Sequence, residues 1–294
     1  MVFRFLIMIK KMLISLLVVA VILAGLGVYA VWQQHLKTRQ ARQNAKAPQI
    51  SVTFLEGWSN QEIANYLEKN GIVKASDFLI ALKQTDTANY SALAEKPQNS
   101  GLEGFLFPDT YFIPKNGKTP RELSQIIIKK ALDNFQAKIS AEMISRAKDN
   151  GINFYQTLIL ASIIEKETGR QAASQTQKDT LQTERQLIAG IFYNRLNAGM
   201  PLQSDATVNF ITQKNDPTPS EADTKIDSPY NTYQYKGLPP GPICNPSLSS
   251  ILAALNPTAT NYFYFLHNQK TGQAFYAQTY EEHLANKQKY LNKK

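Results

Sequence analysis

Two glutamates at the end of an apolar segment are the residues in this chain best placed for acid chemistry. Residues 158–164 carry no charge, and Glu165, Lys166 and Glu167 follow them directly. A carboxyl group held against apolar side chains loses hydration, which raises its pKa and keeps it protonated near neutrality, as a general acid requires. The simpler interpretation is a helix end whose glutamates lie in water beside Lys166.

A helix is expected to carry both glutamates. Asn153 followed three residues later by Gln156 is a capping-box pattern, so we predict a helix over about 154–168. At about 100° per residue, Glu165 and Glu167 point about 200° apart. Glu167 shares its face with isoleucine and leucine side chains, whereas Glu165 shares its face with smaller and more polar ones. Glu167 is therefore predicted to be the desolvated catalytic acid.

Three loop clusters rich in proline, glycine or turn-forming polar residues follow this helix, at residues 200–206, 228–233 and 237–246. Stiff loops of this kind hold polar side chains in place at low entropic cost. Each polar residue taken singly is typical of a turn, but together, around a carboxyl group, they indicate a polysaccharide cleft. The predicted substrate-binding residues are Gln203, Ser204, Asp205, Asn231, Thr232 and Tyr233.

The number of carboxylates required separates the candidate reactions. A glycoside hydrolase of the muramidase class generally needs two, and Asp205 is the candidate for the second. A lytic transglycosylase needs only one, because the C6 hydroxyl of muramic acid attacks C1 within the same sugar. Glu167 would then protonate the leaving oxygen and afterwards accept the hydroxyl proton. A non-catalytic scaffold that binds glycan is the third hypothesis.

The basic charge of the chain is concentrated near its beginning. The 294 residues suffice for about two domains and carry a formal net charge of +9. Residues 1–46 contain seven basic residues and no acidic one, so the remainder is nearly neutral. This distribution does not suggest a nucleic-acid surface.

Residues 12–32 are predicted to form a transmembrane helix. They contain no formal charge and would span about 31 Å as a helix, close to the thickness of a hydrocarbon core. The alternative, a signal peptide, fits less well because the apolar run is long and lacks a convincing cleavage site. Basic residues flank both ends, so charge alone does not set the orientation; a short cytoplasmic tail at 1–11 favours N-in, C-out. Residues 33–48 are expected to be a juxtamembrane linker.

No metal or other cofactor is expected. Cys244 is the single cysteine, which excludes an intramolecular disulfide and a multi-cysteine metal site. The three histidines are scattered along the chain, and no His-Glu-x-x-His motif is present.

The rest of the chain predicts an α+β fold in two parts. A strand near 50–55, a helix begun by Ser59 with Glu62 and a second helix begun by Ser76 make a small module at 49–85. The connecting segment 86–118 holds an aromatic stretch at 102–114, for which we expect a strand pair packed between domains rather than a sugar-stacking surface.

The catalytic domain is expected to occupy residues 119–294. It begins with a strong helix start, Thr119-Pro120 with Glu122, and includes a long helix at about 180–198. A hairpin is expected between Tyr262–Leu266 and Gln273–Ala277, followed by a terminal helix capped by Thr279 with Glu282. No other elements are predicted among the loops and aromatic residues after Gly199.

The sequence resembles the endolytic murein transglycosylases of the MltG, or YceG-like, type. The resemblance covers most of residues 50–290 in order. The matching motifs are Leu-Glu-Gly-Phe-Leu-Phe-Pro-Asp-Thr-Tyr at 102–111, Ala-Ser-Ile-Ile-Glu-Lys-Glu-Thr at 161–168, Phe-Tyr-Asn-Arg-Leu at 192–196, Met-Pro-Leu-Gln-Ser-Asp at 200–205, Tyr-Asn-Thr-Tyr at 230–233, Gly-Leu-Pro-Pro-Gly-Pro-Ile-Cys-Asn-Pro at 237–246 and Tyr-Phe-Tyr-Phe at 262–265.

This resemblance implies a LysM-like module at 49–85 and a lysozyme-like transglycosylase domain after it. In that wider group a hydroxyl residue follows the catalytic glutamate, which fits Glu167-Thr168 and not Glu165-Lys166. It also implies cleavage of nascent peptidoglycan strands in the periplasm beside the inner membrane, leaving 1,6-anhydro-muramic ends, with peptidoglycan synthases as partners.

Overall fold

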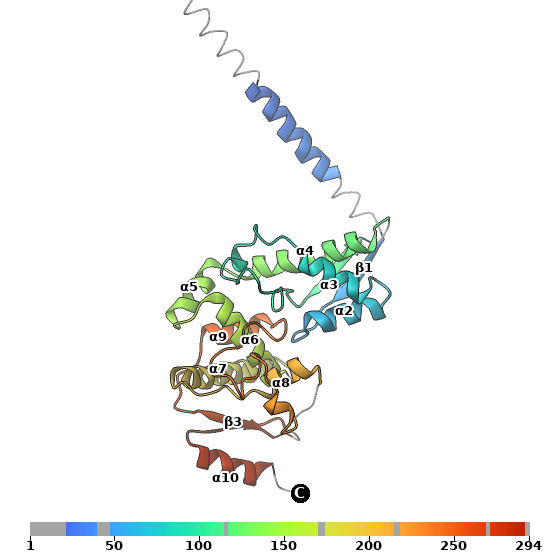
Figure 1. The fold of residues 1–294 in the computed structure, drawn as a ribbon. Helices are drawn as coiled ribbons and strands as arrows, with labels where there is room; N and C mark the ends of the chain where they lie inside the picture. Colours follow the sequence, from blue (N-terminus) through green and yellow to red (C-terminus); the bar gives the residue numbers. More distant parts are fainter. Residues whose placement is uncertain are drawn as a thin grey trace, which may run out of the picture. The chain divides into compact units, whose positions relative to one another are not determined.

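The computed structural model describes residues 22–39, 48–114, 117–169, 174–214, 218–268 and 271–291. The chain divides into two compact units, Met1–Ile50 with Pro114–Gly117, and Ser51–Ile113 with Lys118–Lys294. In the first unit, residues 22–39 form a helix that is blue in Figure 1. No helix among the described residues is long and apolar enough to cross a membrane. The predicted tail 1–11 and the first part of the predicted span 12–32 lie outside the described residues, as do residues 40–47 of the linker.

From residue 49 onward the structure is mostly helical with a few short strands, in agreement with the coarser part of the predicted α+β class. The elements in chain order are β1 (Gln49–Thr53), α2 (Asn60–Lys69), α3 (Ala75–Lys83), a 3-10 turn (Ser91–Leu93), β2 (Thr110–Pro114), α4 (Pro120–Lys138), α5 (Ala141–Asp149), α6 (Phe154–Thr168), α7 (Gln175–Asn197), α8 (Asp205–Thr212), a 3-10 turn (Asp223–Lys225), α9 (Leu248–Leu255), β3 (Tyr264–His267), β4 (Ala274–Ala277) and α10 (Tyr280–Tyr290).

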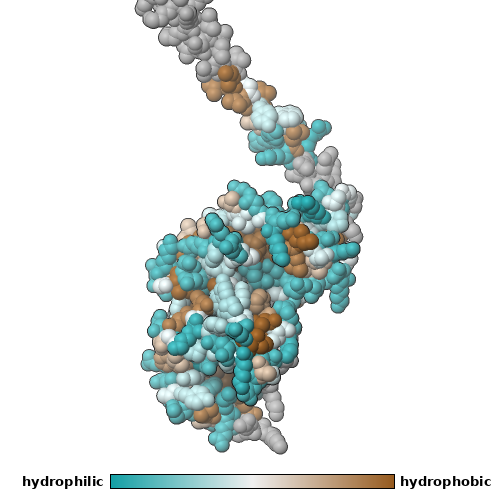
Figure 2. All heavy atoms as spheres, viewed as in Figure 1, coloured by the Kyte–Doolittle hydropathy of each residue, from teal (hydrophilic) through white to brown (hydrophobic). Residues whose placement is uncertain are grey.

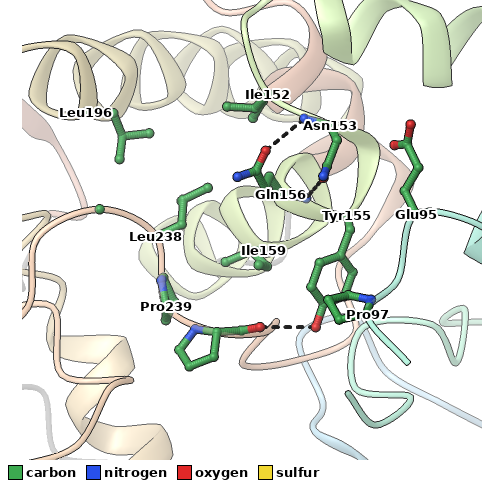
Figure 3. A pocket seen from close by; sticks show the side chains of 12 residues that line it. Glu95, Pro97, Ile152, Asn153, Tyr155, Gln156, Ile159, Leu196, Leu238 and Pro239 are labelled. Carbon is green, nitrogen blue, oxygen red and sulfur yellow. Dashed lines mark hydrogen bonds between the residues drawn. The ribbon is translucent and has the colours of Figure 1, made fainter. Parts of the chain in front are cut away.

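Helix α6 is the central element of the second unit and packs against α5, α7, α8 and α9 (Figure 1). Its bounds confirm the predicted helix at 154–168, and the predicted capping box is present (Figure 3). The Asn153 backbone donates to Gln156 Oε1 at 2.9 Å, and the Gln156 backbone donates to Asn153 Oδ1 at 2.8 Å. Nearly every residue of α6 before Lys166 is buried, because neighbouring helices cover it on several sides.

Other predicted helix starts are also confirmed. Ser59 with Glu62 and Thr119 with Glu122 form complete capping boxes, and Thr279 accepts a hydrogen bond from the Glu282 backbone. The prediction that Ser76 begins a helix is wrong. Helix α3 begins after Lys74, whose carbonyl accepts the Phe78 amide, so Ser76 lies within the first turn.

The aromatic stretch at 102–114 does not form a strand pair within itself, so that prediction is wrong. Only its last five residues are a strand, β2, which pairs with β1 in a two-stranded sheet. Gly104, with a φ of +89°, turns the chain before that strand. Phe105 and Phe107 are buried in the core, whereas Phe112 on β2 is 59% exposed, so the stretch contributes mainly packing.

The C-terminal hairpin is confirmed: β3 and β4 are antiparallel, with Phe265 opposite Tyr276, and α10 packs on them. Helices α8 and α9, by contrast, lie where only loops were predicted. Each has eight residues, too short for its hydrophobic pattern to distinguish it from a loop, and packing against α6 accounts for its stability.

Asn245 connects the beginning of the second unit to its centre. Its Oδ1 accepts the Leu106 amide at 2.9 Å, and its Nδ2 donates to the Trp58 carbonyl at 2.9 Å and to Asn60 Oδ1 at 3.0 Å. Residues from the predicted module 49–85 and from the predicted catalytic domain 119–294 therefore share one compact unit. The boundary between them stays a prediction.

Candidate functional site

Glu167 lies in the last turn of α6 with its side chain partly exposed. Its Oε1 accepts a hydrogen bond from the Ser204 hydroxyl at 2.5 Å. Burial raises the pKa of Glu167, and the nearby charge of Asp205 raises it further, whereas the Ser204 hydrogen bond and the neighbours His267 and Arg195 lower it. A carboxyl group with a raised pKa that still reaches the surface can give a proton to a bound substrate.

Asp205 begins α8 immediately after Ser204, and its side chain is hydrogen-bonded to Tyr233 in the predicted loop 228–233. Its Oδ1 accepts the Tyr233 hydroxyl at 2.5 Å. Burial raises the pKa of Asp205 and the bond from Tyr233 lowers it. The pKa of Tyr233 is itself raised, mainly by burial and also by Asp205. Tyr233 therefore stays a neutral phenol that donates a hydrogen bond to the carboxylate.

Backbone and hydroxyl groups join the segments 200–206 and 228–233. The Gln203 amide donates to the Thr232 carbonyl, and the Ser204 amide donates to Thr232 Oγ1, each at 3.0 Å. The Thr207 and Thr232 hydroxyls lie 2.9 Å apart. Gln203 takes a left-handed φ of +51°, which directs the chain into α8 and leaves its side chain exposed. The pairing fixes Ser204, and through Ser204 the position of the Glu167 carboxyl.

Two of the predicted binding residues are enclosed by the loops. Asn231 and Thr232 are 0% and 1% exposed. Asn231 Nδ2 donates to the carbonyls of Thr224 and Ile226, and its Oδ1 accepts the Tyr233 amide. These contacts give both residues a role in shaping the loops. Ser204, Asp205 and Tyr233 come together beside Glu167, whereas the Gln203 side chain accepts a hydrogen bond from Arg195 at 3.4 Å. Direct contact between any of the six and a substrate stays a prediction.

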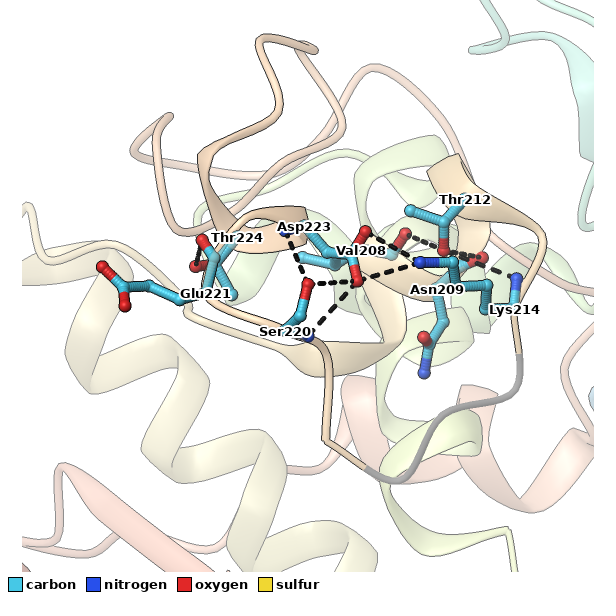
Figure 4. A network of polar contacts seen from close by, with 8 residues as sticks. All are labelled: Val208, Asn209, Thr212, Lys214, Ser220, Glu221, Asp223 and Thr224. Atoms are coloured by element: carbon cyan, nitrogen blue, oxygen red, sulfur yellow. Dashed lines mark hydrogen bonds and ion pairs between the residues drawn. The ribbon is translucent and has the colours of Figure 1, made fainter.

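A polar network supports the loop that Asn231 braces (Figure 4). Lys214, just after α8, lies 3.0 Å from Asp223, and the Ser220 hydroxyl donates to the same carboxylate at 2.7 Å. Asp223 precedes Thr224, whose carbonyl accepts from Asn231. The end of α8 and the 228–233 segment are thus connected through one short surface turn.

Glu165 has a different environment from Glu167. It is 3% exposed, and its Oε2 accepts both the Ser247 amide at 2.9 Å and the Ser247 hydroxyl at 2.5 Å. Arg185 on α7 lies 4.0 Å from its Oε1. Ser247 is the N-cap of α9, so Glu165 joins the end of α6 to the start of α9 and balances a buried guanidinium.

Sequence reasoning missed Arg195 and His267. The Arg195 guanidinium donates to the carbonyls of Phe263 at 2.6 Å and Leu202 at 2.8 Å, and it stacks 5.0 Å above the Tyr264 ring. His267 Nε2 lies 2.8 Å from Glu184 Oε1. An arginine within an apolar stretch of a predicted helix was the signal that could have indicated a role for Arg195. The scattered positions of the histidines gave no such signal for His267.

No group of three or more His, Cys, Asp or Glu residues that could hold a metal occurs within the described ranges. The described groups around Glu167 are carboxyl, hydroxyl and guanidinium groups. The family model described as "YceG-like family" matches residues 24–289. The chain belongs to the YceG-like family.

Relatives of this YceG-like protein support the assignment. It is 35% identical over 256 residues to an endolytic murein transglycosylase of Bacillus subtilis, covering 83% of this chain and 66% of that protein. It is 32% identical over 265 residues to the protein of the same name in Streptococcus pneumoniae, covering 83% of this chain and 45% of that one. The chain thus spans between about half and two thirds of the length of these relatives.

A crystal structure gives the same result for the fold. A YceG-like protein of Listeria monocytogenes superposes with a TM-score of 0.65 at 31% identity, covering 81% of this chain and 76% of the other. The family predicted from the motifs is confirmed by both kinds of similarity.

Proposed function

We propose that this YceG-like protein is an endolytic lytic transglycosylase that cleaves the β-1,4 bond between MurNAc and GlcNAc in nascent peptidoglycan strands. The observation that carries the proposal is Glu167: a carboxyl group at the tip of a buried helix, with a raised pKa, one hydroxyl partner and a partly exposed side chain. The names of the relatives agree with this chemistry. Strand cleavage of this kind would terminate elongation.

The reaction needs only Glu167 for proton transfer. The protonated carboxyl gives its proton to the glycosidic oxygen as the C1–O bond breaks, and GlcNAc leaves with a free hydroxyl. The C6 hydroxyl of MurNAc then bonds to C1 and returns a proton to the carboxylate, which forms the 1,6-anhydro ring without consuming water. Ser204 holds one carboxyl oxygen, so the other is the oxygen that exchanges protons.

The decisive experiment compares products of the unaltered protein with those of Glu167→Gln on purified uncrosslinked glycan. We expect 1,6-anhydro ends by mass spectrometry from the former, and at least about a thousandfold lower rate from the variant, because the proton donor is lost. Glu221→Gln is the matched control, since the Glu221 side chain is 84% exposed and lies outside the site. Full activity in Glu167→Gln would remove the assignment.

The same experiment tests the hydrolase alternative. Asp205 follows the serine that contacts Glu167, which favours it as the second carboxylate of a muramidase. Its carboxylate is engaged by Tyr233, which makes it a poorer base for activating water. Reducing MurNAc ends in place of anhydro ends would establish hydrolysis, and strand binding without turnover would establish a glycan-binding scaffold.

We further propose that residues 12–32 anchor the protein in the inner membrane, with the catalytic part in the periplasm. The charge-free sequence supports this, as do the exposed apolar side chains of Leu23, Val28 and Val31 on the described helix. Figure 2 shows brown, hydrophobic patches on the described part of this helix. The strand β1 and the two helices α2 and α3 within residues 49–85 support a LysM-like module there, and β2 pairs with β1 from outside those bounds. Deletion of residues 1–32 should move the protein from the membrane to the soluble fraction; retention there would contradict the anchor. Peptidoglycan synthases are the partners that this location would favour.

A further inference from the structure

A hollow that Glu167 does not line lies between the loop before Glu103 and the loop that ends at Pro242. Its volume is about 460 Å³, within the range of small-ligand sites. It adjoins a cavity of similar volume beside the start of α6, and the two share Pro97, Tyr155 and Pro240 in their linings (Figure 3). Glu167 lines neither cavity.

Two tyrosine hydroxyls converge at Gly241 in the wall of this hollow. A Cβ on Gly241 would lie 2.8 Å from the Tyr230 hydroxyl and 3.0 Å from the Tyr155 hydroxyl. The Tyr155 hydroxyl donates to the Pro240 carbonyl, at 3.2 Å, whereas the Tyr230 hydroxyl makes no hydrogen bond to the residues that the structure describes. The glycine therefore lets both hydroxyls approach its backbone closely, and the Tyr230 hydroxyl is the one available to a ligand.

Glu103 supplies a carboxyl group to the same wall. Both of its oxygens accept the Asn60 amide, at 3.0 and 3.1 Å, which fixes the side chain. Burial raises the pKa of Glu103 to about 8, so the carboxyl keeps its proton at neutral pH and can donate as well as accept. No lysine or arginine lines the hollow.

The composition of the wall identifies the ligand class. Tyrosine rings and the prolines Pro240 and Pro242 offer apolar faces to the C–H side of a pyranose and to an acetamido methyl group. Hydroxyl and neutral carboxyl groups offer hydrogen bonds to uncharged sugar hydroxyls. A stem peptide would bring carboxylates, and the ammonium group of Lys96, a cation beside the lining, already donates to the Pro97 and Ser100 carbonyls.

We propose that this hollow is a second glycan subsite, which holds an N-acetylated sugar several positions from the bond being cleaved. Tyr155 and Glu167 stand at opposite ends of α6, twelve residues or about 18 Å apart along its axis. Only a strand of several sugars can reach both places. The subsite, which rests on the proposed function, would thus make the enzyme favour long strands.

Binding to the full-length chain in a Glu167→Gln background tests the subsite without turnover. The probe is the β-1,4-linked hexamer of N-acetylglucosamine, titrated by calorimetry. We expect about fivefold weaker binding for Tyr230→Phe, which loses one hydrogen bond, and about tenfold or greater weakening for Gly241→Ala, whose methyl group would displace the Tyr230 and Tyr155 hydroxyls. Glu103→Gln, which keeps a neutral donor and acceptor, should bind within about twofold of the parent.

Tyr235→Phe is the matched control, because Tyr235 is on the same loop, is exposed and bonds to Asp227 outside the hollow. Parental affinity in both Tyr230→Phe and Gly241→Ala would overturn the subsite. Competition by a soluble stem tetrapeptide would overturn the sugar assignment in favour of a peptide. Anhydro products from the unaltered chain together with parental hexamer binding in the variants would remove the subsite alone; weakened binding without any product would remove the catalytic proposal alone.

Discussion

The two glutamates of α6 lie on different faces of the helix and therefore have different surroundings. Glu165 and Glu167 are two residues apart, yet Glu165 points to Ser247 and Arg185 and is almost fully buried. Glu167 points to Ser204 and keeps part of its surface. The helical angle predicted that the two side chains point to different neighbours, but not that Glu165 would be the more buried of the two.

The neighbour Asp205 should set the pH range of activity. Its negative charge raises the pKa of Glu167, so Asp205→Asn removes that contribution and lowers the pKa. The acid form of Glu167 is then lost at lower pH. We expect the alkaline limb of the pH–rate profile of glycan cleavage to move to lower pH, measured against Asp77→Asn on α3 as the control. An unchanged limb would show that Asp205 does not influence the proton donor.

Glu165→Gln should affect stability more than chemistry. The amide keeps an acceptor for Ser247 but leaves the buried Arg185 without its opposite charge. We expect a loss of about 1–3 kcal/mol in the free energy of unfolding by urea, with the cleavage rate per folded molecule retained within a fewfold. A stable but inactive variant would transfer the catalytic role from Glu167 to Glu165.

At the scale of elements, local signals were reliable where side chains cap helices. Asn153 with Gln156, Ser59 with Glu62 and Thr119 with Glu122 each predicted a helix start that the structure has. The signals failed at α8 and α9, because two-turn helices depend on tertiary packing that no short window of sequence records.

The candidate site was likewise predictable only where local sequence carries the information. Loop composition indicated that the segments around Ser204 and Tyr233 belong together, and they do meet. It could not show that Asn231 would direct its amide to backbone carbonyls, nor that Arg195 and His267 would come from α7 and β3 to the neighbourhood of Glu167. Those outcomes depend on how distant elements pack.

The backbone conformation and the surroundings of Gly104 require a glycine at this turn. Its φ of +89° strains other residues, and a Cβ there would stand 2.7 Å from Pro242. Gly104→Ala should therefore lower the free energy of unfolding by about 2 kcal/mol or more. Gly101→Ala, where nothing lies within 4 Å of the new methyl group, should be close to neutral in the same urea titration. Equal stability of the two variants would contradict this account of the turn.

At the scale of the whole molecule, one loop connects most of the second unit. Asn245 reaches Trp58, Asn60 and Leu106, and two residues later Ser247 receives Glu165 and begins α9. The loop thus joins the β1–α2 region, the connecting segment and the central helices. Unfolding of this unit is expected to be a single transition by circular dichroism and by intrinsic fluorescence alike. Two separated transitions would show that the region 49–85 melts independently.

That loop has a consequence for how such chains can be recombined. Removing residues 49–85 would strip the Asn245 carboxamide of two partners inside the protein, and each lost partner costs about 1–3 kcal/mol. The predicted catalytic domain and the region 49–85 therefore depend on each other structurally. A graft of a foreign module would succeed only if it supplied a carbonyl and an amide oxygen at the same two points.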